Sequence, residues 1–395
     1  MDNMKKLNYK HTISACFVGY IVQAIVCNFA PLLFVGWNKE FNISLVQLTS
    51  IITVTFFTQI VVDLIATKYA DKVGYKNCLL ISHGCSFLGF VLLAILPYTV
   101  KNVFAGIMAS VMLYSIGSGL LEVLISPVVE SCPTSNKAGA MSLLHSFYCW
   151  GSVLVIGAST LYMAVFGREY WRYLSYIWAG LALLNGIFFY FVPIKEPTKE
   201  DAKRDSKLFK SKFFYIAIIL MICAGAAELA MSQWASTFAE NGLHVSKTVG
   251  DLAGPMAFAI LMGTGRVIFS KVSSKINIKK YLCMSAVVCI IAYLMAGCAK
   301  NPIVSLIGCA MCGLAVSAMW PGTISLSTDI LKSGSTMLFG ILALSGDVGC
   351  TMGPTLIGYI TNLYHGDFKK GLLFAIMFPV IILISILGIN KKKVR

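Results

Sequence analysis

The sequence is short of charge, and above all of acidic charge. Only 12% of its 395 residues are charged, and 17 Asp and Glu stand against 32 Lys and Arg. A soluble chain carries about a quarter charged residues. Hydrophobic residues make up 57% of the chain, and the mean hydropathy is +0.79. This composition excludes an ordinary soluble domain and indicates a chain whose solvent is a lipid bilayer.

Other missing features exclude whole classes of function. The sequence has no HExxH motif, and its one CxxC pair, Cys309 and Cys312, lies in an apolar run without a second pair to complete a zinc site. Residues 242–248 lack the glycine that precedes the lysine of a phosphate-binding loop. No polar segment is long enough to form a nucleotide-binding domain. We therefore expect neither an enzyme nor a primary pump, and no cofactor or metal.

The basic residues lie in short segments between apolar runs. The net charge of +15 would suggest nucleic acid as the partner of a soluble protein. Here its placement fits anionic lipid headgroups and the positive-inside rule instead. We expect a membrane-lipid partner and no nucleic acid, and we interpret the 13 cysteines as reduced packing residues.

Apolar runs long enough to cross a bilayer recur along the whole chain. Crossing the hydrocarbon core takes roughly 20 residues. The first run is too long for a signal-peptide core, so we expect it to be a true span. The predicted spans are 12–37, 45–70, 78–99, 102–131, 138–165, 170–193, 213–240, 248–273, 279–299, 302–330, 335–362 and 370–390.

One long polar stretch, residues 194–212, divides these spans into two sets of six. The sequence thus predicts an all-α polytopic membrane protein with 12 transmembrane helices in two pseudo-symmetric six-helix bundles, 1–193 and 213–395, joined by a cytoplasmic linker. Three quarters of the Lys and Arg residues fall on the side of the linker and both termini. This bias predicts cytoplasmic termini. We expect a monomer, and a bacterial inner membrane as its location.

The two halves show traces of an internal repeat. Placing residues 23–34 over 228–239 aligns Gln23 with Glu228, and Asn28 with Gln233. Three further matches follow in chain order: Asp63 and Lys76 with Arg266 and Lys279, Ser126-Pro127 with Trp320-Pro321, and Gly151 with Gly349. Four ordered matches at similar offsets indicate duplication of a six-span unit.

Three acidic residues lie within the apolar runs, where an ionisable group usually faces a cavity or a partner. Glu122, Glu228 and Asp347 are the candidate proton-coupling residues, with Glu122 the first choice. Glu122 could also hydrogen-bond substrate or form a structural pair. Glu228 divides between substrate ligand, proton site and structural pair, and Asp347 between a cavity group and a partner for backbone loosened by Gly346 and Gly349.

Amides, hydroxyls and indoles in the apolar runs predict a polar solute site, because polyhydroxylated solutes need paired hydrogen bonds and flat apolar faces. His145 and Tyr148 share a helix face, although His145 could equally be a core histidine. Tryptophans could instead belong to the interfacial belt. The candidate substrate-binding residues are Gln23, Asn28, His145, Tyr148, Glu228, Ser232, Gln233, Trp234 and Trp320.

Charged residues near the predicted cytoplasmic ends of spans are assigned to gating. Asp63 and Arg266 occupy equivalent positions in the two halves, and each is expected to make a structural or gating pair. The loop at 67–76 resembles the loop signature of the major facilitator superfamily, G-x-x-x-D-[RK]-x-G-[RK]-[RK]. Asp71, Lys72, Gly74 and Lys76 match, while Thr67 and Tyr75 depart from it. The resemblance implies that this loop belongs to the cytoplasmic gate.

Within that superfamily the chain looks most like the fucose:proton symporter group and related sugar porters. Span four resembles their G-x-x-x-L-E-x-x-x-N-P motif, from Gly117 to Pro127, with Ser126 in place of the asparagine. Span seven resembles their G-x-E core, except that Gly225 and Glu228 are one residue further apart.

Spans ten and five carry two more motifs of that group. Span ten resembles G-x-x-x-S-x-x-[FW]-P, with Gly313, Ser317, Trp320 and Pro321. Residues 145–151 resemble H-S-F-x-x-x-G. In that group the span-four glutamate is a protonation site, which implies the same role for Glu122.

These observations predict a secondary active transporter that imports a sugar or similar small polar solute together with a proton, by alternating access. The alternative is a proton-driven exporter of drugs or metabolites. An exporter would need a more apolar cavity, with the three acids attracting cations.

Overall fold

The chain folds into long membrane-spanning helices. The computed structural model describes residues 7–133, 137–195, 209–272, 275–331 and 336–389, and in these ranges it contains helices and no strand. Within these ranges, twelve helical segments are long and apolar enough to cross a membrane, which confirms the predicted number. The first extends over Tyr9–Phe41, somewhat beyond the predicted 12–37.

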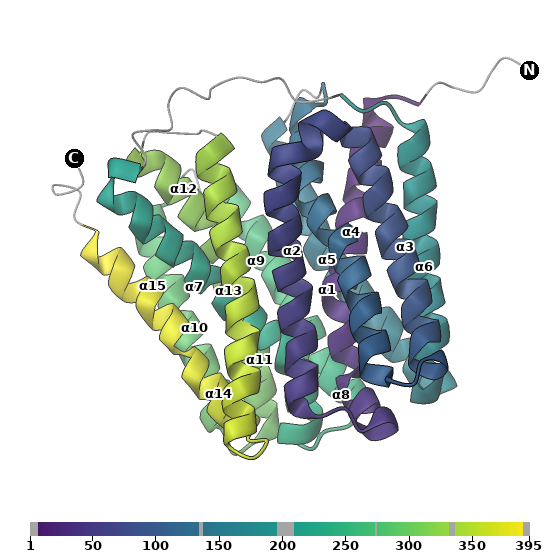
Figure 1. Ribbon diagram of the computed structural model, residues 1–395. Helices are drawn as coiled ribbons and strands as arrows, with labels where there is room; N and C mark the ends of the chain where they lie inside the picture. Colours follow the sequence, from purple (N-terminus) through teal and green to yellow (C-terminus); the bar gives the residue numbers. More distant parts are fainter. Residues whose placement is uncertain (1–6, 134–136, 196–208, 273–274, 332–335, 390–395) are drawn as a thin grey trace, which may run out of the picture. The chain divides into compact units, whose positions relative to one another are not determined.

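The first half of the chain contributes six long helices (Figure 1). Their bounds are α1 Tyr9–Phe41, α2 Leu45–Val73, α3 Tyr75–Thr99, α4 Val103–Ser131, α5 Lys137–Phe166 and α6 Trp171–Phe191. A 3₁₀ turn, Arg168–Tyr170, precedes α6.

The second half also contributes six spans, but three of them are interrupted. Its helices are α7 Lys212–Thr237, α8 Lys247–Asp251, α9 Ala257–Val272, α10 Ile278–Cys298, α11 Pro302–Val316, α12 Met319–Leu331, α13 Thr336–Leu363, α14 Phe368–Ala375 and α15 Met377–Gly388. Two π-helical turns, Phe238–Gly242 and Leu252–Met256, extend α7 and join α8 to α9.

Prolines account for the three interruptions. A proline removes one helical N–H donor, and its ring clashes with the carbonyl four residues earlier. Pro321 acts in this way at Ser317, the C-cap of α11, and Pro379 at Ala375, the last residue of α14. Pro255 lies inside the π turn between α8 and α9. Prolines therefore interrupt the helices of three spans whose apolar sequences are continuous.

The chain divides into two compact units, which are described separately. Unit 1 comprises residues 1–30 and 57–199, and unit 2 comprises 31–56 and 200–395. The predicted halves, 1–193 and 213–395, differ from these units chiefly in segment 31–56, the hairpin that joins α1 to α2. Of the predicted linker, 194–212, only residues 194–195 and 209–212 are described.

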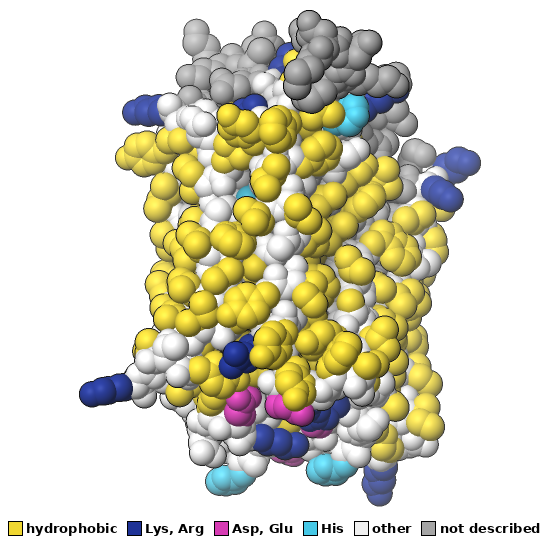
Figure 2. Space-filling view, turned by 90° about the vertical axis from the view of Figure 1, so that its right-hand side faces the viewer, with side chains coloured by type: hydrophobic (Ala, Val, Ile, Leu, Met, Phe, Trp, Pro, Cys, Tyr) yellow, Lys and Arg dark blue, Asp and Glu magenta, His cyan; other side chains and the backbone are white. Residues whose placement is uncertain are grey.

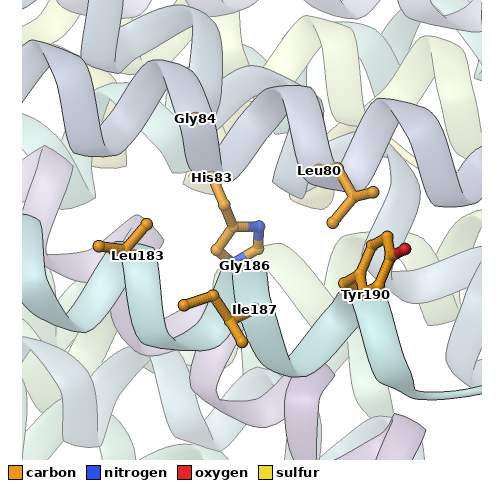
Figure 3. Close-up of a pocket in the computed structure, with 7 residues that line it drawn as sticks. All are labelled: Leu80, His83, Gly84, Leu183, Gly186, Ile187 and Tyr190. Atoms are coloured by element: carbon orange, nitrogen blue, oxygen red, sulfur yellow. The ribbon is translucent and has the colours of Figure 1, made fainter.

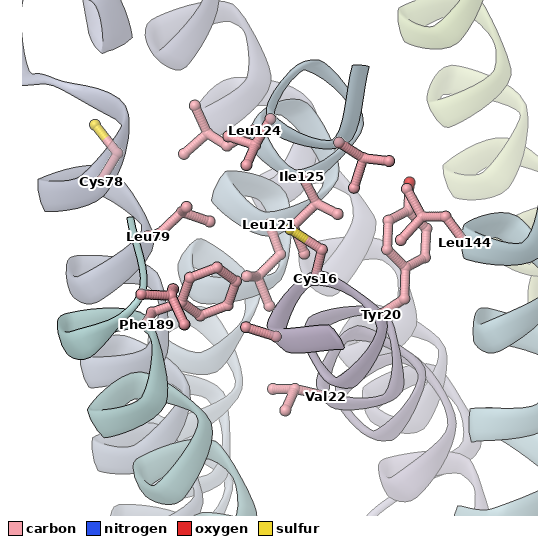
Figure 4. Close-up of a cluster of buried hydrophobic side chains, with 14 of the residues drawn as sticks. Cys16, Tyr20, Val22, Cys78, Leu79, Leu121, Leu124, Ile125, Leu144 and Phe189 are labelled. Atoms are coloured by element: carbon pink, nitrogen blue, oxygen red, sulfur yellow. The ribbon is translucent and has the colours of Figure 1, made fainter. Parts of the chain in front are cut away.

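Unit 1 is built around α3 and α4. Helix α3 packs against both α4 and α6. Leu121, Leu124, Ile125 and Val128 project from α4 into a cluster of buried hydrophobic side chains (Figure 4). Their spacing places them on one face of the helix. The cluster also takes Cys16 and Tyr20 from α1, Leu79 from α3 and Phe189 from α6.

Unit 2 is built around α7, which packs against α13, α12, α15 and α11. Glycines bring α7 and α13 together. A Cβ added at Gly349 would meet the carbonyl oxygen of Ile222, and one at Gly353 would meet that of Ala226. Small residues at such a crossing let two helix backbones approach closely, which is how membrane helices commonly associate.

Matching contacts in the two units support the internal repeat. Lys76 Nζ donates to the carbonyl of Val192 at 3.4 Å, and Lys279 Nζ donates to that of Ile389 at 2.7 Å. Val192 and Ile389 are the C-caps of the sixth and twelfth spans. In both halves a lysine at the start of the third span thus satisfies a carbonyl at the end of the sixth, one of the groups a helix leaves unpaired.

The surface fits a bilayer environment. Figure 2 shows hydrophobic side chains over the middle of one face, with most charged side chains towards its two ends. Large apolar residues such as Leu161, Leu184 and Ile384 are more than 60% exposed. Such side chains face lipid in a chain of this kind. The protein is a multi-pass membrane protein.

Candidate functional site

The polar centre of unit 1 joins α1, α2 and α4. Gln23 Nε2 donates to Glu122 Oε2 at 2.9 Å. Asp63 presents a carboxylate oxygen within 4.8 Å of one from Glu122. Gln23 and Asp63 are 4% and 7% exposed, and Glu122 is half-buried. Two carboxylates this close repel each other, so the pair is suited to hold a proton or a small cation.

The second polar atom of the Gln23 side-chain amide is its oxygen, Oε1. Its Oε1 atom is buried and receives no hydrogen bond from the residues that the structure describes. A buried acceptor without a donor costs free energy, and such a group often marks a ligand or water position. The amide therefore offers an acceptor beside Glu122 to an incoming hydroxyl group.

Helix α4 presents a line of polar groups along one face. Ser118, Glu122 and Ser126 follow one another at intervals of four residues, so they lie on one side of the helix. Ser126 Oγ lies 3.1 Å from the Tyr20 hydroxyl. The Tyr20 ring meets the His145 ring edge to face, with centroids 5.6 Å apart. His145 of α5 and Ser126 of α4 therefore both contact Tyr20 of α1.

Asn28 and Tyr148 are joined through a serine. Asn28 Nδ2 donates to Ser152 Oγ at 3.1 Å and to the carbonyl of Ala24 at 2.9 Å. Ser152 in turn donates to the backbone carbonyl of Tyr148 at 3.0 Å. These bonds orient Asn28 towards α5. They use its amide nitrogen, so its amide oxygen can accept a hydrogen bond from another partner.

Sequence reasoning missed Gln59 and Ser118. Gln59 Nε2 donates to Ser118 Oγ at 2.9 Å, which links α2 to α4. Gln59 lies one helical turn before Asp63, and Ser118 one turn before Glu122. A search for polar residues four positions from each acidic residue would have found both.

The polar centre of unit 2 is an ion pair between α7 and α9. Arg266 Nη2 lies 3.3 Å from Glu228 Oε1 and 3.2 Å from Oε2. The Arg266 and Glu228 side chains are 17% and 9% exposed. One residue assigned to gating and another assigned to substrate or proton thus contact each other directly. Each charge compensates the other at membrane depth.

The other candidates on α7 lie in different surroundings. Trp234 is fully buried, its ring contacts those of Phe34 and Phe368, and its Nε1 donates to the carbonyl of Pro354 at 2.8 Å. These contacts favour a packing role for Trp234. Gln233 is 2% exposed and Ser232 is half-buried. The substrate roles of all three stay predictions.

Trp320 and Asp347 are close in space. The Trp320 ring lies against Gly346, the residue before Asp347 on α13, so closely that a Cβ at Gly346 would overlap it. Asp347 itself is 7% exposed. The structure therefore brings the edge of an indole ring next to the helix turn that carries an acidic side chain.

The loop between α2 and α3 has the backbone that its motif requires. Gly74 has φ +88°, a conformation that side-chain-bearing residues rarely adopt. Lys72 is exposed, with its Nζ 5.7 Å from the centroid of the Tyr69 ring. The side chain of Asp71 lies outside the described part of the structure, so its predicted gating contact stays a prediction.

Comparison with known proteins identifies a family for most of the chain. Residues 13–354 match the model of the Major Facilitator Superfamily. This match includes residues of both units and all of the candidate site residues.

Solved structures of transporters share the fold. A D-xylose–proton symporter superposes with a TM-score of 0.77 at 15% identity, over 98% of each chain. The E. coli fucose:proton symporter superposes with a TM-score of 0.66 at 15% identity, over 95% of this chain and 97% of that one. A bacterial homologue of the human lysosomal transporter Spinster reaches 0.77 at 12% identity, over 98% and 97%. At these identities the likeness shows the fold alone.

Proposed function

Since the chain belongs to the Major Facilitator Superfamily, and is thus a transporter rather than an enzyme, we propose that it imports a sugar or similar small polar solute together with a proton. Glu122 carries the proton in this proposal. Gln23 couples proton and solute, because its amide bonds Glu122 through one atom and offers the solute the other. Asp63 places a second carboxyl group beside Glu122.

The hydrogen bonding of the Gln23 side-chain amide is the main support for the proposal. Its Nε2 donates to Glu122, while its buried Oε1 has no donor in the described residues. A solute hydroxyl at Oε1 would satisfy that acceptor. Solute binding and the protonation state of Glu122 would then share one side chain, which is what coupled transport requires.

The similar structures support a sugar as the solute. Two of them are named as symporters of a sugar and a proton, one for D-xylose and one for fucose. The hydroxyl and amide groups around Tyr20, Asn28 and His145 suit a polyhydroxylated molecule. Trp320 is proposed as a further substrate-binding residue, and Asp347 as a further proton-coupling residue.

A proton-driven exporter is the second candidate. The acidic pair of Asp63 and Glu122 favours it, because carboxylates at membrane depth attract organic cations. The Spinster homologue, as similar in fold as the xylose symporter, is named only as a transporter.

A panel of solutes in proteoliposomes tests the proposal. Purified protein is reconstituted with a pH-sensitive dye inside, and sugars, nucleosides and amphipathic cations are added outside. Symport predicts internal acidification driven by one polar solute. Internal alkalinisation driven by a cation added outside would establish the exporter. Solute uptake that needs external sodium and moves no proton would transfer the coupling to sodium.

A further inference from the structure

Unit 1 contains an apolar groove between α3 and α6, away from the polar residues described above. Its volume is about 270 Å³, and its walls are formed by Leu80, Gly84, Leu183, Gly186, Ile187 and Tyr190 (Figure 3). Leu183, Ile187 and Tyr190 are 42%, 48% and 61% exposed, so the groove opens on the outer surface of the unit. In a membrane-spanning segment that surface faces lipid chains.

The floor of the groove offers no free polar group. His83 lies at its base, with Nδ1 2.8 Å from the carbonyl of Leu79 and Nε2 2.8 Å from Asn185 Nδ2. Both ring nitrogens therefore have partners, and His83 is only 1% exposed. Gly84 and Gly186 leave the space that larger side chains would fill. The groove is thus suited to a hydrocarbon chain.

A cation lies at the end of the groove where α3 begins and α6 ends. Lys76 Nζ is 5.7 Å from the centroid of the Tyr190 ring and donates to the carbonyl of Val192 at 3.4 Å. An ammonium group has three donors, so Lys76 can still bind another acceptor. Lys195, which follows α6, is exposed and adds positive charge at the same end.

We propose that this groove is a binding site for an anionic phospholipid. One acyl chain lies between Leu80 and Leu183 over the two glycines, and the phosphate group accepts a hydrogen bond from Lys76. Apolar grooves that end in basic residues near a membrane surface suit anionic headgroups. The groove is separate from the polar residues of the proposed solute site, and the proposal stands whether or not the protein is a sugar symporter.

Native mass spectrometry of the purified protein tests this site. The protein, in a non-ionic detergent, is titrated with phosphatidylglycerol or phosphatidylcholine. The wild type is expected to bind its first phosphatidylglycerol about fivefold more tightly, since one lysine near a membrane surface contributes about 1 kcal/mol. Lys76→Gln should abolish that preference. Lys279→Gln is the matched control, because Lys279 makes the equivalent carbonyl contact in unit 2, and it should preserve the preference.

A second pair of variants tests the groove itself. A side chain at Gly84 meets open space, with nothing within 4 Å of its Cβ, so Gly84→Leu fills the groove without a clash. This variant should lose the first lipid of either class. Gly180→Leu on α6 is equally unobstructed and lies outside the groove, so it should bind as the wild type does. Ile187→Trp narrows the groove from the other wall and replaces Gly84→Leu if that variant fails to fold.

Three results would overturn the proposal. The first is wild-type lipid binding by Gly84→Leu or Ile187→Trp. The second is a preference for phosphatidylglycerol that survives in Lys76→Gln. The third is an equal loss in Lys279→Gln, which would place the anionic preference elsewhere on the protein.

Discussion

Buried charged residues in this protein act through specific neighbours, and Glu228 with Arg266 shows how. Neither group lies more than one fifth exposed, and the guanidinium reaches both carboxylate oxygens. Removing one partner of such a pair leaves a charge at membrane depth without compensation. Removing both charges leaves no uncompensated charge at membrane depth.

Arg266→Met is therefore expected to destabilise the protein by about 3 kcal/mol. The double variant Glu228→Gln/Arg266→Met should recover most of that loss, because no isolated charge remains. Thermal unfolding in detergent, followed for the wild type, both single variants and the double variant, measures the coupling. Additive losses in the double variant would show that the two residues do not depend on each other.

The sequence identified both of these residues but not their contact. Each was recognisable as a charge in an apolar run. They lie 38 positions apart on different spans, and the contact depends on how each helix is rotated towards the other. The same holds for Gln23 with Glu122. Periodicity places a residue on a face of its own helix, whereas tertiary packing decides which helix that face meets.

At the scale of the helices, glycine contacts control how closely α7 and α13 approach. A Cβ at Gly349 would meet the Ile222 carbonyl and also lie 2.8 Å from the Ala226 nitrogen. These are backbone atoms, which cannot turn aside as a flexible side chain would. The two helices must separate to admit even a methyl group.

Gly349→Val is expected to destabilise unit 2 by about 1–3 kcal/mol, the usual range for overpacking a close contact. Gly340→Val is its control, since Gly340 lies on the same helix with nothing within 4 Å of an added Cβ. Yield of monodisperse protein and the unfolding temperature provide the measurement. Equal behaviour of the two variants would mean that the close crossing is not needed for stability.

The number and order of the helices could be predicted, whereas their interruptions could not. A run of about 20 apolar residues predicts a membrane-spanning helix. Pro255, Pro321 and Pro379 are also visible in the sequence, but Pro31, Pro97 and Pro127 lie in α1, α3 and α4 without ending them. Whether a membrane helix breaks at a proline depends on the neighbours that can satisfy the freed backbone groups.

For the whole molecule, the positive-inside bias predicts the orientation in the membrane. The charge difference between the two sets of loops is large, and it predicts that both termini lie in the cytoplasm. A C-terminal green fluorescent protein fusion should therefore fluoresce in bacterial cells, while a C-terminal alkaline phosphatase fusion should be inactive. An active phosphatase fusion and a non-fluorescent fluorescent-protein fusion would show the opposite orientation. Lys76 would then meet lipid headgroups on the other side of the membrane.

The central claim is that Glu122 carries the proton that drives solute uptake. The measurement that tests it most directly is solute-driven acidification in proteoliposomes, made beside solute counterflow, which needs no net proton movement. Glu122→Gln should lose the acidification and keep counterflow, because the neutral amide still bonds Gln23 but cannot release a proton. Glu169→Gln, at an exposed position between α5 and α6, should keep both. Undiminished acidification in Glu122→Gln would contradict the account.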